Sequence, residues 1–301
     1  MKPFNEFMWG YSCTINMAVK TFLKRNIRRM MNLFAPMTVA NITELAPNEL
    51  LRGRFALVTG GTSGIGFAIA EAFLKAGASV AITSRRAMSA TEAVTKLRQV
   101  CGVDECRILG FEMDNSKVTQ LHENLRRITQ ALGKIDILVN NAGVLGADSE
   151  EQCYDIVLDT NLKGVFYLSR EVARYMKDNN IRGNILNIAS SSSLRPATSA
   201  YALSKWGVRG LTLGLAKSLA PYGIVVNGIA PGPTATPMLL GDDTDNIARS
   251  RIPSGRFAMP CEIANMAVVL VSDMGRTIVG DIVYMTGGAG VVTLDDVDYS
   301  F

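Results

Sequence analysis

The fold is decided by Phe55-Ala-Leu-Val-Thr59 and by the stretch that follows it, Gly60-Gly-Thr-Ser-Gly-Ile-Gly66. The first run is apolar or β-branched and predicts a buried strand, and the glycines after it predict a tight turn. Residues 67–76 then carry apolar side chains at helical spacing. A strand, a glycine-rich turn and a helix in this order begin a βαβ unit. The free N–H groups at the start of such a helix suit phosphate groups.

The same alternation continues to residue 285. Further strands are predicted at residues 79–84, 107–113, 135–140, 184–189, 224–230 and 278–285, and helices at 88–100, 117–132, 150–178, 199–220 and 261–272. Near-continuous apolar strands separated by helices are typical of a parallel sheet that is buried on both faces. The sequence therefore predicts an α/β protein with a Rossmann-type doubly wound parallel sheet, in a single domain with a helical N-terminal extension.

The first fifty residues differ from the rest. Residues 1–34 hold six basic side chains against one acidic one, and apolar side chains recur there at helical spacing. We predict a basic amphipathic N-terminal extension and linker at 1–50, a dinucleotide-binding catalytic domain at 51–290 and an acidic C-terminal tail at 291–301. The extension is expected to pack on the domain or on a neighbouring subunit. A peripheral membrane helix is the weaker alternative, followed by a transit peptide or an expression artefact.

Composition excludes several kinds of site. The 301 residues are 48% hydrophobic and 19% charged, which suits one large folded domain with an appendage. The chain has a single histidine, His122, so a histidine-rich metal site is excluded, and we predict no metal. His122 is expected on the surface of a helix. A small, dispersed net charge of +4 argues against nucleic acid as a partner. Five scattered cysteines without a C-x-x-C pair predict free, mostly buried thiols and a cytoplasmic location.

Tyr201 and Lys205 are four residues apart on a predicted helix, so they share one face of it. A phenol with its reference pKa of about 10 is a weak base near neutral pH. An ammonium group about 4 Å away would lower that pKa. We therefore predict that Tyr201 exchanges a proton with a carbonyl or an alcohol as a general acid and base.

Five motifs occur in one order: Thr59-Gly-x-x-x-Gly-Ile-Gly66, Asn140-Asn-Ala-Gly143, Thr160-Asn161-Leu-Lys-Gly, Tyr201-x-x-x-Lys205 and Pro231-Gly-x-x-x-Thr236. With them, about residues 53–288 of the chain resemble the short-chain dehydrogenase/reductase family. Ile252-Pro-Ser-Gly-Arg256, followed by Pro260, is similar to its 3-oxoacyl-carrier-protein reductase-like members. The resemblance implies an oxidoreductase that moves a hydride between a nicotinamide cofactor and a carbonyl or secondary alcohol. It also implies a homo-oligomer, either a dimer or a tetramer.

The resemblance further implies a catalytic set of Asn161, Ser190, Tyr201 and Lys205. Ser190 is chosen from four consecutive serines by its place after the fifth strand, but its spacing to Tyr201 is shorter than is usual in the family, so Ser191 and Ser192 stay open. Asn161 is expected to bend its helix and to hold a water that links Lys205 to solvent.

The cofactor is predicted from Ser84-Arg85-Arg86 at the end of the second strand. A ribose without a phosphate is usually bound there by Asp or Glu, whereas arginine pairs with a 2′-phosphate. This favours NADP(H) over NAD(H). Asp114 is expected at the adenine, with a helix cap as its alternative, and Thr236 at the nicotinamide. The predicted cofactor-binding residues are Gly60, Thr62, Ser63, Gly64, Ile65, Gly66, Ser84, Arg85, Arg86, Asp114, Asn115, Asn141, Ala142, Gly143, Tyr201, Lys205, Pro231, Gly232, Thr234 and Thr236.

Two other functions use the same motifs. A dinucleotide-binding regulatory or scaffold protein would need the fold but no turnover. A nucleotide-sugar epimerase also uses a Tyr–Lys pair, but the chain after Pro231 is too short for a larger substrate domain. The segment 234–259 is expected to cover a small-molecule substrate and fits an acyl thioester, a sugar, a steroid or a small ketone equally well.

Overall fold

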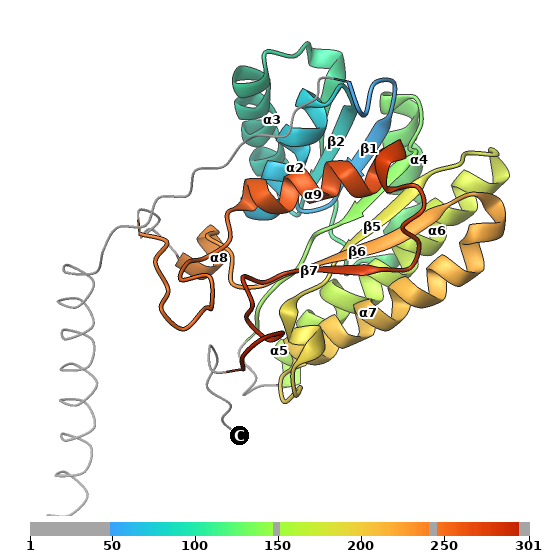
Figure 1. Ribbon diagram of the computed structural model, residues 1–301. Helices are drawn as coiled ribbons and strands as arrows, with labels where there is room; N and C mark the ends of the chain where they lie inside the picture. The colour runs from blue at the N-terminus through green and yellow to red at the C-terminus, as the bar shows by residue number, and fades with distance from the viewer. Residues whose placement is uncertain (1–48, 147–150, 241–245, 295–301) are drawn as a thin grey trace, which may run out of the picture. The chain divides into compact units, whose positions relative to one another are not determined.

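The computed structural model describes residues 49–146, 151–240 and 246–294, which belong to one compact unit, Ala40–Phe301. Within these residues, seven parallel strands form one sheet in the order β3-β2-β1-β4-β5-β6-β7 (Figure 1). The strands are β1 Phe55–Val58, β2 Ser79–Ser84, β3 Ile108–Glu112, β4 Ile137–Asn140, β5 Asn184–Ile188, β6 Val225–Pro231 and β7 Ile282–Met285. The strand order reverses between β1 and β4, which confirms the predicted Rossmann-type doubly wound sheet.

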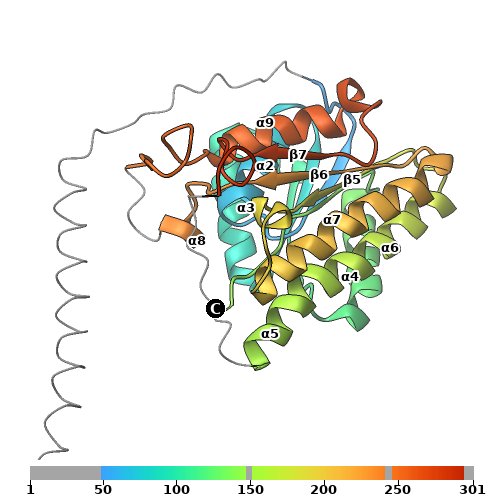
Figure 2. The same cartoon turned by 60° about the horizontal axis from the view of Figure 1, so that its bottom comes forward.

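Helices cover both faces of the sheet (Figure 2). One face is covered by α2 Gly64–Lys75, α3 Ala87–Cys101 and α9 Pro260–Val271, and the other by α4 Leu121–Leu132, α6 Gly164–Asp178 and α7 Ala200–Leu219. Two apolar clusters fill these layers. On the first face Ile69 and Phe73 of α2 pack with Ile263 of α9, and on the second Leu125 of α4 packs with Leu168 of α6. The near-continuous apolar strands are therefore buried from both sides, as their sequences predict.

The predicted elements are confirmed to within a few residues, with three differences. The helix expected at 150–178 is instead α5 Glu151–Leu158, a π-helical turn at Asp159–Lys163 and α6. The last strand begins at Ile282, later than expected. A short helix, α8 Pro237–Leu240, follows β6 and was not expected, because four residues are too few to show a helical period.

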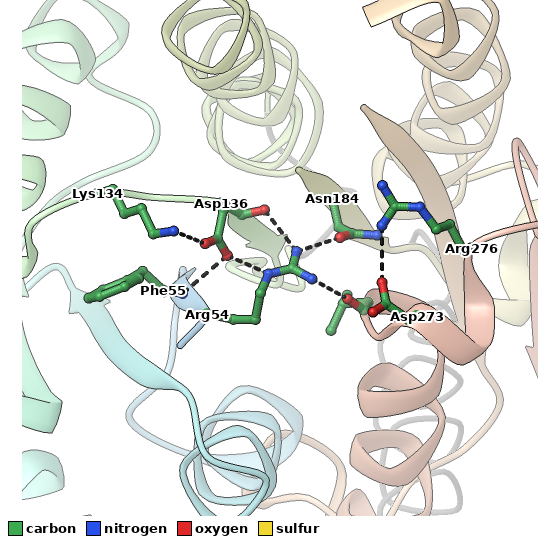
Figure 3. A network of polar contacts seen from close by, with 8 residues as sticks. Arg54, Phe55, Lys134, Asp136, Asn184, Asp273 and Arg276 are labelled. Carbon is green, nitrogen blue, oxygen red and sulfur yellow. Dashed lines mark hydrogen bonds and ion pairs between the residues drawn. The ribbon is translucent and has the colours of Figure 1, made fainter. Parts of the chain in front are cut away.

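A polar network ties the strands together at their amino ends, the edge opposite to the glycine turn (Figure 3). The Arg54 guanidinium donates to Asp136 Oδ1 at 2.9 Å, to Asn184 Oδ1 at 2.7 Å and to the Val271 carbonyl at 3.3 Å. Lys134 Nζ lies 3.2 Å from the second carboxylate oxygen of Asp136. The segments that precede β1 and β4, the start of β5 and the end of α9 are thus joined at one point.

Some of the sequence predictions concern residues that the structure does not describe, and others can be compared with it. Residues 1–48 of the predicted extension and 295–301 of the predicted tail lie outside the described residues. His122 is exposed on α4, as expected, and lies 3.1 Å from Glu171. None of the four described cysteines is fully buried, which corrects the prediction of mostly buried thiols, and Cys106 is exposed because it sits in a surface turn. None of the described helices is long and apolar enough to cross a membrane.

Candidate active site

The carboxyl ends of the strands open into a cleft of about 1060 Å³. It extends from the ends of β2 and β3, past the glycine turn after β1, to the segments that follow β4, β5 and β6. This is the edge, at the point where the strand order reverses, at which doubly wound sheets bind their ligands. All predicted cofactor residues line the cleft except Gly66.

The glycine turn is held by close approach to the segment after β4. A Cβ on Gly66 would overlap Asn141 Nδ2 and the Gly60 carbonyl, so only glycine fits there. Asn141 Nδ2 donates to the carbonyls of Thr59 and Gly60, at 2.9 and 3.0 Å. Asn141 is one of the predicted cofactor-binding residues. It lines the cleft, but its amide N–H groups are bound to the turn, so its observed role is to fix the turn's shape.

The end of β2 presents two exposed cations to the cleft. Arg85 and Arg86 both line it, and the Arg86 N–H donates to Ser84 Oγ at 3.3 Å. Asp114, at the end of β3, is the one acidic residue among the described residues that line the cleft. Its Oδ1 accepts from the backbone N–H and the hydroxyl of Ser116, at 3.0 and 2.8 Å, so it caps the turn after β3. The positive charge of Arg85 and Arg86, which the sequence predicts at the end of β2, is therefore exposed at the cleft.

Tyr201, Ser190 and Lys205 come together on the floor of the cleft. The Tyr201 side chain is hydrogen-bonded to the side chain of Ser190. Lys205 is buried one turn further along α7, with Nζ 5.6 Å from the centre of the Tyr201 ring. Lys205 Nζ donates to the carbonyl of Ile188, the last residue of β5, at 2.9 Å. Tyr201 and Lys205 therefore lie on one face of α7, as their four-residue spacing predicts.

The pKa of Tyr201 moves opposite to the expectation. Burial raises the pKa of the Tyr201 phenol, and the hydrogen bond from Ser190 opposes this only in part. Burial also lowers the pKa of Lys205 from 10.5 to about 8. The expected lowering at Tyr201 was wrong because desolvation by burial is the largest effect on the phenol, and the Lys205 ammonium group is bonded to the Ile188 carbonyl. The phenol thus keeps its proton near neutral pH and is ready to donate it.

Ser190 is the serine that reaches Tyr201. Its Oγ also accepts from the Ser192 N–H at 3.1 Å and lies 3.2 Å from Ser192 Oγ. The Ser193 hydroxyl instead donates to the Ser190 carbonyl at 2.7 Å and is fully buried. Residues Ser191–Leu194 form a 3-10 turn capped by Ser190, which explains how the shortened loop still brings Ser190 to the tyrosine.

Asn161 lies in the π-helical turn and does not line the cleft. Its Oδ1 accepts from the Val144 N–H at 2.8 Å, and its Nδ2 donates to the Val144 carbonyl at 2.9 Å and to Ser204 Oγ at 3.3 Å. The π-helical turn interrupts the helix at the position where a bend is predicted, and such turns are frequent at functional sites. The water link to Lys205 stays a prediction. Sequence reasoning missed Val144 and Ile188, whose backbone groups hold Asn161 and Lys205, because residue type carries no signal for a backbone contact.

The segment after β6 closes the other side of the cleft. The methyl group of Thr236 lies 3.2 Å from the position that a Cβ on Gly64 would take, so this segment reaches the glycine turn. The Thr234 hydroxyl donates to the Gly232 carbonyl at 2.9 Å and stiffens the bend before α8. Downstream, Arg256 forms two hydrogen bonds of 2.8 Å with Glu262 at the start of α9, which anchors the returning chain.

Known proteins resemble this chain over the same region. The family described as Enoyl-(Acyl carrier protein) reductase matches residues 60–290. A 3alpha-hydroxysteroid dehydrogenase of Mediterraneibacter gnavus is 34% identical over 248 residues, which are 80% of this chain and 98% of that protein. A 3-oxoacyl-[acyl-carrier-protein] reductase of Thermotoga maritima is 35% identical over 247 residues, or 79% of this chain and 98% of that protein.

Solved structures agree with these matches. A short chain dehydrogenase from Burkholderia cenocepacia in complex with NADP superposes with a TM-score of 0.70 at 32% identity, covering 79% of this chain and 98% of that one. A 3-ketoacyl-(acyl-carrier-protein) reductase from Brucella melitensis complexed with NADH gives 0.72 at 30% identity, covering 80% and 100%. The fold, the ordered motifs and these similarities lead to one conclusion. The chain belongs to the short-chain dehydrogenase/reductase family of oxidoreductases.

Proposed function

We propose that this protein is an NADP(H)-dependent oxidoreductase that transfers a hydride between the cofactor and a carbonyl or secondary alcohol, with Tyr201 as the general acid and base. The observation that carries the proposal is the hydrogen bond between Tyr201 and Ser190, with Lys205 buried beside it, in the same cleft as the glycine turn. The cleft thus holds a proton donor (Tyr201), a hydroxyl that can orient the substrate (Ser190) and the glycine turn for the phosphates. A hydride transfer that is coupled to proton transfer needs these three parts close together.

The residues of the cleft fit a nicotinamide dinucleotide phosphate. The glycine turn leaves backbone space next to the amino end of α2, where N–H groups and the helix dipole suit a diphosphate. Arg85 and Arg86 are placed to pair with a 2′-phosphate, and the residues directly after β2 include no acid that would repel it. A bound nicotinamide dinucleotide would supply the hydride. NADP is favoured over NAD for these reasons, and the Burkholderia relative with NADP supports that choice.

Each residue of the proposed catalytic set then has a distinct task. Ser190 donates a hydrogen bond to the substrate oxygen and holds it beside Tyr201. Tyr201, protonated because burial raises its pKa, gives its proton to that oxygen during reduction. The positive charge of Lys205 stabilises the phenolate that remains, and Asn161 keeps the helix turn next to Val144 in place. In the reverse direction, the oxidation of an alcohol, the deprotonated Tyr201 would accept the proton.

The competing function is a dinucleotide-binding regulatory or scaffold protein without turnover. NADPH consumption with a panel of ketones and aldehydes separates the two. We expect carbonyl-dependent oxidation of NADPH and a weaker rate with NADH. NADPH binding without consumption over the whole panel would favour the scaffold.

We also propose that the protein is a homo-oligomer, a dimer or a tetramer. Tyr167 on α6 and Trp206 and Leu213 on α7 are large apolar side chains exposed to solvent, and a neighbouring subunit would cover them. Residues 1–50 are proposed to support assembly and to take no part in the chemistry. Light scattering of the full chain and of a chain starting at Glu49 tests both points. The shorter chain keeps Leu51, which is fully buried in the core, and should keep its kcat. A cytoplasmic location stays a prediction.

A further inference from the structure

Two apolar segments flank the reacting groups. β5 ends just before Ser190 and lies between β4 and β6 in the sheet. Leu145 belongs to the segment after β4, whereas Met238 and Leu239 belong to α8, after β6. All three line the cleft, and they are 52%, 58% and 49% exposed. We call these three side chains the apolar rim.

The helix α8 holds two side chains of the apolar rim, Met238 and Leu239, at the cleft. Its last residue, Leu240, packs against a small apolar cluster that includes Ile252 and Phe257. The backbone N–H groups of Leu239 and Leu240 are both bonded to the Thr236 carbonyl, at 3.0 and 2.9 Å. One side of the helix is therefore anchored in the protein. Met238 and Leu239 remain exposed at the cleft, where an apolar ligand could cover them.

This end of the cleft has no exposed cation among the described residues that line it. Among the described residues that line it, the charged side chains are Arg195 and Lys205, and both are buried. The Arg195 guanidinium lies against the backbone of Gly290. A strongly acidic carrier protein needs exposed cations around the mouth, and this rim offers apolar side chains instead.

We infer that the substrate is a free, uncharged ketone or secondary alcohol carried on a bulky apolar body. The oxygen meets Ser190 and Tyr201 on the polar floor, and the apolar body covers Leu145, Met238 and Leu239. Apolar walls with a few polar groups for orientation are the usual design of a small-molecule pocket. A polyhydroxylated substrate would leave unpaired those of its hydroxyls that face the three side chains of the apolar rim. This inference rests on the proposed function and narrows its substrate class.

The test compares three carbonyl substrates with the full-length protein and NADPH. The probes are trans-1-decalone, which is bicyclic and apolar, dihydroxyacetone, and an acetoacetyl group on acyl carrier protein. We expect kcat/KM for decalone to exceed the other two at least about tenfold. The double variant Met238→Ser, Leu239→Ser should lower kcat/KM for decalone about tenfold or more, because each loss of apolar contact weakens binding of the reacting complex. Its Kd for NADPH, measured by calorimetry, should not change.

Met274→Ser is the matched control. Met274 is 64% exposed, but it follows α9 at the opposite edge of the sheet, so all three kcat/KM values should stay at the wild-type level. Preference for dihydroxyacetone or for the carrier-bound group would overturn the inference and leave the proposed function standing. A double variant whose kcat/KM for decalone equals that of the wild type would also overturn the inference. If no carbonyl consumes NADPH, the proposed function itself fails and the inference falls with it.

Discussion

Lys205 Nζ donates to the carbonyl of Ile188 at 2.9 Å, which fixes an ammonium group on the floor of the cleft, where the residue is only 6% exposed. Burial lowers the pKa of Lys205 from 10.5 to about 8. This lowering corresponds to a destabilisation of the folded state by about 3 kcal/mol at neutral pH. The buried ammonium group of Lys205 thus destabilises the folded protein, which points to a role in the reaction rather than in stability.

Lys205→Met should therefore make the protein more stable at pH 7, by up to about 3 kcal/mol in the free energy of unfolding. The pH dependence follows from the lowered pKa. Below pH 8 the folded state holds the charged lysine and carries the full destabilisation, whereas between about 8 and 10.5 it releases the proton before the unfolded chain does, and wild-type stability rises. The difference between the two proteins should shrink between pH 7 and 9.5 in urea denaturation. A variant that is less stable than the wild type at pH 7 would contradict this account.

Arg85→Ala should weaken NADPH binding about ten- to a hundredfold, the worth of hydrogen bonds to a charged group, and should hardly change NADH binding. The reason is that the 2′-phosphate is the only group that distinguishes the two cofactors. Calorimetry on both cofactors measures this, with Arg276→Ala, at the amino edge of the sheet, as the control (Figure 3). Equal losses for NADPH and NADH would refute recognition of the phosphate by Arg85.

Gly66→Ala should abolish dinucleotide binding, because the added Cβ overlaps Asn141 Nδ2 and the Gly60 carbonyl and would open the turn. Gly214→Ala on α7 is its control. A Cβ there meets nothing within 4 Å, and alanine should stabilise the helix by up to about 1 kcal/mol. NADPH affinity and thermal melting report the two effects. Wild-type affinity in Gly66→Ala would show that the turn does not shape the site.

Arg54→Leu should lower the free energy of unfolding by about 3 kcal/mol, because it leaves the 5% exposed Asp136 side chain with only Lys134 as an ionic partner. The network lies at the edge of the sheet away from the cleft, so kcat/KM of the folded variant should equal that of the wild type (Figure 3). Urea denaturation and steady-state kinetics measure the two quantities. A loss below about 1 kcal/mol would mean that the network does not join the strands energetically.

The sequence predicts those parts of the site that depend on local spacing. The turn after Thr59 and the shared face of Tyr201 and Lys205 follow from strand, glycine and helical periods, and the structure has both. The contact between Asn161 and Val144 joins residues 17 positions apart across the end of β4, which no local pattern encodes. The pKa direction at Tyr201 was missed for a related reason. It depends on burial by distant segments, which spacing along one helix does not reveal.

The central claim is that Tyr201 carries the proton, and Tyr201→Phe tests it most directly. The substitution removes the hydroxyl and its bond to Ser190 while the ring, which packs beside Lys205, remains. With a carbonyl that the wild type reduces, kcat should fall by at least ~10²-fold, and the Kd for NADPH should not change, because general acid catalysis is typically worth 10²–10⁴. Turnover close to the wild-type rate in a variant that binds NADPH normally would contradict the account.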